Sequence, residues 1–125
     1  MKLIQLAYKL LAITSILFFF TKCFPDNLKE KMEEATVHMV DQNFKTTIAL
    51  IELHKIRSGS YPESLDSLEF LGIMDVSNFS ALEYSKNNNG YNLNIKNTDK
   101  NYLKKFNYTV EFWENLGIVN CNIKK

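Results

Sequence analysis

Apolar residues between Asp26 and Leu71 recur three or four positions apart, the spacing of a helix with one buried face. Charged residues fill the intervening positions, and the pattern places Glu52 among them on the solvent side. No Gly or Pro interrupts Asn27 to Ser58, so the sequence predicts one continuous helix roughly 45 Å long. The apolar residues form two adjoining stripes, Leu28, Met32, Ala35 and Met39 on the first and Val37, Val40, Phe44, Ile48 and Ile51 on the second.

Both ends of this helix carry boundary signals. Pro25 is tolerated at a first turn, and Asp26 or Asn27 can cap the free amides that follow. Gly59 is the stop signal. Beyond it, Pro62 fixes the backbone for a new first turn, and a short helix packed on the core is predicted from the three-residue spacing of Leu65, Leu68 and Leu71.

The rest of the chain alternates between apolar and polar residues, as strands do. Residues 81–85 and 91–95 flank Asn88-Asn89-Gly90, a strong hairpin signal because Asn and Gly accept positive φ. Residues 108–113 and 118–123 flank a second turn at residues 114–117 and predict a second hairpin. The predicted fold is therefore α+β, with the long helix packed on a four-stranded antiparallel sheet.

The first 22 residues resemble a membrane-targeting segment. Leu10 to Phe20 is apolar except for Thr14 and Ser15, a length typical of a signal peptide. Cys23 follows at the position of a bacterial lipobox cysteine, although Lys22 stands where a small residue is usual. Two alternatives remain, a lipidated Cys23 and an uncleaved N-terminal anchor. Either one predicts residues 1–22 as signal peptide or membrane anchor and residues 23–125 as a single extracytoplasmic domain in the cell envelope.

The chain length and the net charge limit the number of domains and the classes of partner that the protein can have. A chain of 125 residues suffices for one domain. Three of its 15 basic residues lie in the first 22, which leaves 12 basic and 14 acidic side chains and a formal charge of −2 in the rest. This balance gives no electrostatic reason to expect nucleic acid as a partner.

The candidate chemical groups do not form a catalytic or metal-binding pattern. His38 and His54 are too far apart on one helix to share a metal ion. Cys121 lies in a strand-like alternation, where a lone cysteine is usually a small buried apolar residue, and it could bridge to Cys23 only if Cys23 is neither removed nor lipidated. The polar stretch from Asn97 to Asn101 contains one carboxylate and a lysine, so calcium is possible there but not favoured. We expect no cofactor, no metal and no enzymatic activity.

The residues around the helix end are similar to a known family. Gly59, Tyr61, Pro62, Leu65 and Leu68, followed by a hairpin with Tyr84 and Tyr91, resemble the globular domain of type II secretion pseudopilins and type IV pilin-like proteins over about residues 43–95. The prepilin signature is absent, since no Gly precedes the apolar segment and no Glu lies inside it.

This resemblance implies a non-enzymatic, membrane-anchored envelope protein that acts through protein contacts in secretion or pilus-like assembly. The alternative is a small envelope lipoprotein that binds a ligand or inhibits an enzyme. The sequence identifies neither the partner nor the oligomeric state.

Overall fold

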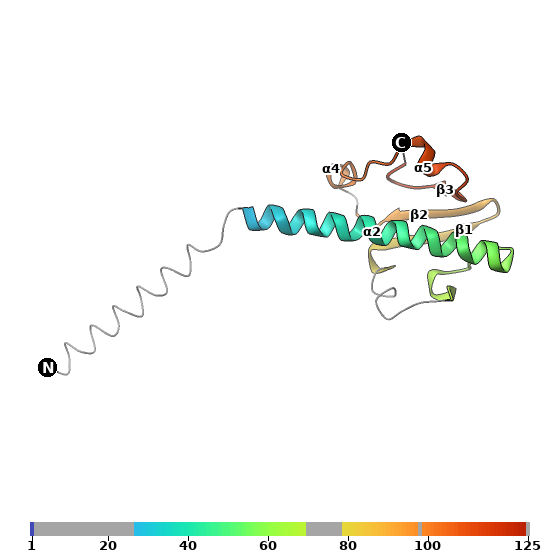
Figure 1. The fold of residues 1–125 in the computed structure, drawn as a ribbon, viewed down its shortest axis with the longest axis horizontal. Coiled ribbons are helices and arrows are strands. Elements are labelled where there is room, and N and C mark those ends of the chain that lie inside the picture. Colours follow the sequence, from blue (N-terminus) through green and yellow to red (C-terminus); the bar gives the residue numbers. More distant parts are fainter. Residues whose placement is uncertain (2–26, 70–78, 98, 125) are drawn as a thin grey trace. The chain divides into compact units, whose positions relative to one another are not determined.

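The computed structural model describes residue 1 and residues 27–69, 79–97 and 99–124. The leader, Cys23 and Leu71 lie outside these residues. The chain forms two compact units, Met1–Ala35 and Thr36–Lys125. Within the described segments, no helix is long and apolar enough to cross a membrane. The elements are α2 (Asn27–Ser58), the 3₁₀ turns η1 (Leu65–Ser67) and η2 (Phe79–Ala81), β1 (Leu82–Asn87), β2 (Gly90–Ile95), α4 (Lys100–Leu103), α5 (Val110–Trp113) and β3 (Ile118–Asn120) (Figure 1).

Helix α2 confirms the predicted long helix and crosses one face of the sheet in the second unit (Figure 1). Its second apolar stripe is buried there, with Phe44 and Ile51 fully covered. The first stripe is not, because Met32 and Met39 are 63% and 58% exposed. The prediction of one buried face that holds both stripes is therefore wrong. At about 100° per residue the centres of the two stripes lie about 150° apart around the helix, so within the second unit the sheet covers only one of them.

Strands β1 and β2 form the first predicted hairpin, with antiparallel pairs from Leu82 opposite Ile95 to Asn87 opposite Gly90. The turn lies one residue earlier than predicted, because Gly90 is already the first residue of β2. Neither Asn88 nor Asn89 adopts positive φ, so the expected backbone of an Asn-Gly turn is wrong. Instead, the side-chain oxygen of Asn87 accepts the N–H of Asn89 at 3.1 Å, which closes the turn locally.

The second predicted hairpin is wrong, and the sheet formed by the described residues has three strands in the order β1-β2-β3. Residues 110–113 form the short helix α5. A helical turn brings Tyr108 and Phe112 onto one side, where their rings stack with centroids 4.3 Å apart. Val110, which strand alternation would place beside them, is 75% exposed. The aromatic contact therefore outweighs the strand-like alternation.

Strand β3 runs parallel to β2, with Tyr91 opposite Ile118. A parallel pair needs a crossover connection, which residues 96–117 provide with α4 and α5. Past β3, the Asn122 side chain takes over the role of a neighbouring strand. Its amide accepts the Ile95 N–H at 3.1 Å and donates to the Ile95 carbonyl at 2.8 Å. The end of β2 is thus hydrogen-bonded by a side chain where β3 has already ended.

Candidate functional site

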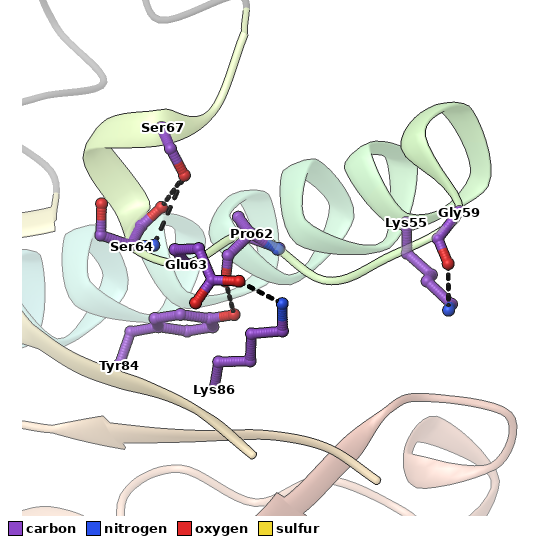
Figure 2. Close-up of polar contacts among 8 residues, drawn as sticks. All are labelled: Lys55, Gly59, Pro62, Glu63, Ser64, Ser67, Tyr84 and Lys86. Atoms are coloured by element: carbon purple, nitrogen blue, oxygen red, sulfur yellow. Dashed lines mark hydrogen bonds and ion pairs between the residues drawn. The ribbon is translucent and has the colours of Figure 1, made fainter. Parts of the chain in front are cut away.

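The turn after α2 joins the helix to the sheet, and Figure 2 shows two of its motif residues, Gly59 and Pro62, with their polar contacts. Gly59 has a φ of 77°, a left-handed conformation that favours glycine, and its N–H donates to the Lys55 carbonyl at 2.9 Å. The Lys55 ammonium group donates to the Gly59 carbonyl at 2.6 Å. Pro62 is fully buried, and its carbonyl accepts the Tyr84 hydroxyl of β1 at 2.6 Å. The turn after α2 is therefore fixed to the sheet.

The second half of the motif fills the core below this turn. Leu65, the first residue of the 3₁₀ turn η1, and Leu68, which follows this turn, are buried at 8% and 5% exposure. The predicted short helix is thus a single turn in the described residues. The Ser67 hydroxyl donates to the Ser64 carbonyl at 2.7 Å and closes this turn (Figure 2). Glu63 also pairs with Lys86 of β1, but its side chain is 82% exposed, so the pair contributes little.

Glu52 is the centre of the site, contrary to its predicted place on the solvent side. Its Oε1 accepts the Tyr91 hydroxyl at 2.9 Å and the Gly117 N–H at 2.8 Å. Its Oε2 lies 3.4 Å from the Tyr61 hydroxyl, a longer contact. One carboxylate thus connects α2 to the motif turn, to β2 and to the segment before β3. We call Glu52, Tyr61, Tyr91 and Gly117 the Glu52 brace.

Three neighbouring tyrosines, of which Tyr61 and Tyr91 contact this carboxylate, are held in their neutral form. Burial, followed by the charge of Glu52 and its hydrogen bond, raises the pKa of Tyr91 far above its ordinary value. The same causes raise the pKa of Tyr61. Burial, with Glu63 and Tyr61 nearby, raises the pKa of Tyr84 to about 12. The rings also touch, since the Tyr91 centroid lies 5.1 Å from that of Tyr61 and 5.7 Å from that of Tyr84. These hydroxyls therefore act as hydrogen-bond donors near neutral pH.

Two glycines allow the brace to close. A Cβ on Gly117 would lie 2.0 Å from the Tyr61 hydroxyl oxygen, and a Cβ on Gly90 would lie 2.0 Å from the Gly117 carbonyl oxygen. Both clashes are far shorter than a van der Waals contact. The sequence pattern assigned these glycines only to turns, and it contains no signal that Gly117 faces Tyr61.

A second polar group joins α2 to the segment before α5. The Tyr108 hydroxyl donates to Asp41 at 2.5 Å, and the Lys45 ammonium group donates to the other oxygen at 2.6 Å. Burial raises the pKa of Asp41, but these hydrogen bonds outweigh it and the pKa lies below its ordinary value. Burial raises the pKa of Tyr108, as does its bond to Asp41. These residues and His38 line an open cleft of about 340 Å³.

The other candidate groups lie apart from one another. Cys121 is half-buried, and burial raises the pKa of its thiol, which opposes the thiolate form that a nucleophile needs. Asp99 accepts the Asn101 N–H at 2.8 Å and caps α4. Over the described part of the chain, no three His, Cys, Asp or Glu side chains are grouped to hold a metal ion.

No protein-family model matches the chain, and no curated protein or solved structure matches it either. The interpretation of the Glu52 brace therefore depends on its own geometry. The two oxygens of the Glu52 carboxylate accept hydrogen bonds from the Tyr61 hydroxyl, the Tyr91 hydroxyl and the Gly117 N–H. This arrangement holds helix and sheet in a fixed relation.

Proposed function

We propose that the protein is a non-enzymatic, membrane-anchored envelope protein with a pseudopilin-like domain that acts through protein contacts, in secretion or pilus-like assembly. The observation that carries this proposal is that the motif residues have structural roles at the end of α2 and in the core. Gly59 ends α2 through its bond to Lys55, Pro62 accepts a hydrogen bond from β1, and Leu65 and Leu68 are buried in the core. A domain whose distinctive residues hold its shape is suited to presenting a surface to other proteins.

Attachment to the membrane is the first part of the proposal to test. Mass spectrometry of the protein purified from its envelope distinguishes the two alternatives. An intact Met1 means an uncleaved anchor, whereas a lipid-modified N-terminal Cys23 means a lipoprotein. An unmodified mature N-terminus would contradict both.

Protein contacts are tested by chemical crosslinking in intact cells. The proposal predicts either ladders of self-crosslinked species or capture of secretion-system components. A variant with Gly117 replaced by Leu, whose side chain would overlap Tyr61, should lose these contacts together with the fold. A wild-type protein that stays strictly monomeric and captures nothing would contradict the assembly role.

One observation favours the second candidate function, an envelope lipoprotein that binds a ligand. Lys100 of α4, Lys104 directly after this helix and Lys124 near the C-terminus line an open groove of about 310 Å³, together with Leu103 and Ile123. Such a groove suits a small anionic molecule with an apolar part. Ligand binding that is lost in a Lys104→Glu, Lys124→Glu variant, with crosslinks absent throughout, would favour this alternative.

A further inference from the structure

The face of helix α2 that points away from the sheet carries exposed apolar residues. Within the second unit it contains Met39, Leu53 and Ile56, which are 58%, 43% and 79% exposed. Single exposed apolar residues are ordinary on protein surfaces, but a row of them on one helix is not. We call the positions Met39, Gln42, Thr46, Ala49, Leu53 and Ile56 the outer stripe.

The outer stripe has the spacing of a coiled-coil seam. Its members alternate three and four residues apart, as positions a and d of a heptad do. At about 100° per residue they lie nearly opposite Phe44, Thr47 and Ile51, which face the sheet. The same spacing continues in the sequence at Ala35, Met32 and Leu28 of the first unit. The heptad therefore covers the length of α2, independently of the residues that build the core.

This spacing favours a helix over a lipid surface as the occupant. Helices that lie on membranes present a broad apolar face bordered by basic residues. The outer stripe is instead narrow, and Gln42 and Thr46 interrupt it near its middle. Polar residues at single seam positions are compatible with coiled coils, where they fix the register.

We propose that the outer stripe pairs with the outer stripe of a second copy of this chain, forming a two-fold helix pair. The small Thr46 and Ala49 lie at its centre and the larger Met39, Leu53 and Ile56 lie toward its ends. The two-fold axis runs along the helices in a parallel pair and across their centre in an antiparallel pair. In both cases it brings the small central residues together and lets the backbones approach. The stripe is thus complementary to itself.

The surface involved indicates a weak contact that needs the membrane. Met39, Leu53 and Ile56 together expose on the order of 200 Å² of apolar surface, whereas a stable interface buries about 800 Å² per partner. The remaining stripe positions and the continuation toward Leu28 add to it. This inference rests on the proposed function, because a shared membrane supplies the effective concentration that a weak interface requires.

The test is site-specific photocrosslinking of the full chain in its membrane, with a benzophenone amino acid in place of Ala49. This exposed position lies near the two-fold axis in either orientation. We expect an adduct of twice the monomer mass, with the second copy labelled on its own outer stripe. The same probe in place of Ser85, an exposed residue of β1, should give no such adduct.

Introducing charges into the seam gives a second test, with a matched control. Met39→Glu with Ile56→Glu should lower the adduct yield about tenfold or more, because charges would enter an apolar seam. Both sites are exposed, so circular dichroism should stay unchanged. Val110→Glu makes the same chemical change at a position that is 75% exposed on α5 and should leave the yield unchanged.

Each other outcome overturns the inference. Equal yields of the dimeric adduct from the probes at positions 49 and 85 would mean that the chains associate at random. An adduct with a different protein alone would overturn self-pairing and leave the proposed protein-contact function standing. The absence of any adduct at position 49, with cellular crosslinks to partners intact, would likewise overturn self-pairing alone.

Discussion

The Glu52 brace makes a quantitative prediction about stability. Replacing Glu52 with Ala leaves the Tyr91 hydroxyl and the Gly117 N–H without their acceptor, and Tyr91 is fully buried. Each unsatisfied buried donor costs about 1–3 kcal/mol. The 3.4 Å contact to Tyr61 adds little. We therefore expect a loss of about 2–5 kcal/mol, a large part of the roughly 5–15 kcal/mol that stabilises a domain.

Two further variants separate the charge from the shape of the side chain. Glu52→Gln keeps one carbonyl oxygen as acceptor and should cost only about 1 kcal/mol, since neutral hydrogen bonds are weaker than charge-assisted ones. Tyr91→Phe removes one donor and leaves Gly117 in place. In a double-mutant cycle, Tyr91→Phe and Glu52→Ala should couple by about 1–2 kcal/mol.

The assay is equilibrium urea unfolding of the purified protein, followed by circular dichroism, with the slope of the transition compared among variants. Tyr84→Phe is the control, because its hydroxyl binds the Pro62 carbonyl and not Glu52. It should be additive with Glu52→Ala. A Glu52→Ala variant within about 0.5 kcal/mol of wild type, or Tyr91 and Glu52 effects that simply add, would show that the brace does not stabilise the fold.

Three other perturbations test the packing. Ile51→Asp should unfold the domain, because an unpaired charge would be buried at a fully covered site. Val110→Asp, at an exposed site, should change the melting temperature little. Equal effects of the two substitutions would contradict the packing of α2 on the sheet. Gly117→Ala should lower the stability of the domain, because the new methyl group would clash with Tyr61. Adding Tyr61→Ala should recover part of this stability in the double variant. Fully additive effects would rule out this contact. The free energy of unfolding should fall as pH rises from about 10 to about 12, because the unfolded chain releases the Tyr84 proton at a lower pH than the folded chain does. In urea titrations at a series of pH values, Tyr84→Phe should make this fall shallower. An unchanged dependence of stability on pH in this variant would refute the raised pKa.

The sequence predicted well those features that depend on neighbouring residues. The span of α2 follows from an uninterrupted helical pattern and from Gly59, whose positive φ the structure confirms. The β1–β2 hairpin follows from alternation around an asparagine-rich turn, and Tyr91, Leu93 and Ile95 are all buried as expected. Local chemistry suffices in both cases.

Features that depend on distant residues were not predictable in this way. Residues 108–113 fit a strand by alternation, but Phe44 of α2 packs against the rings of Tyr108 and Trp113, with centroids 5.8 and 6.4 Å away. That contact favours a helical turn, and only the tertiary fold provides it. The role of Glu52 has the same origin, because its partners Tyr91 and Gly117 lie 39 and 65 residues further along the chain.

The division of α2 into a buried and an exposed stripe is a feature that the sequence pattern of the helix does not determine. The buried residues from Val40 to Ile51 extend over roughly 17 Å of helix, close to the length of a six-residue strand at about 3.3 Å per residue. The length of the sheet therefore matches the length of the buried stripe. That length is fixed by the turn between Asn87 and Gly90 and by the end of β2 at Ile95, where Asn122 closes the edge. Met39, Leu53 and Ile56 stay exposed because they lie on the face of α2 that points away from the sheet. Which face packs on the sheet depends on residues far away in sequence, so the helix pattern alone cannot distinguish a core stripe from a contact surface.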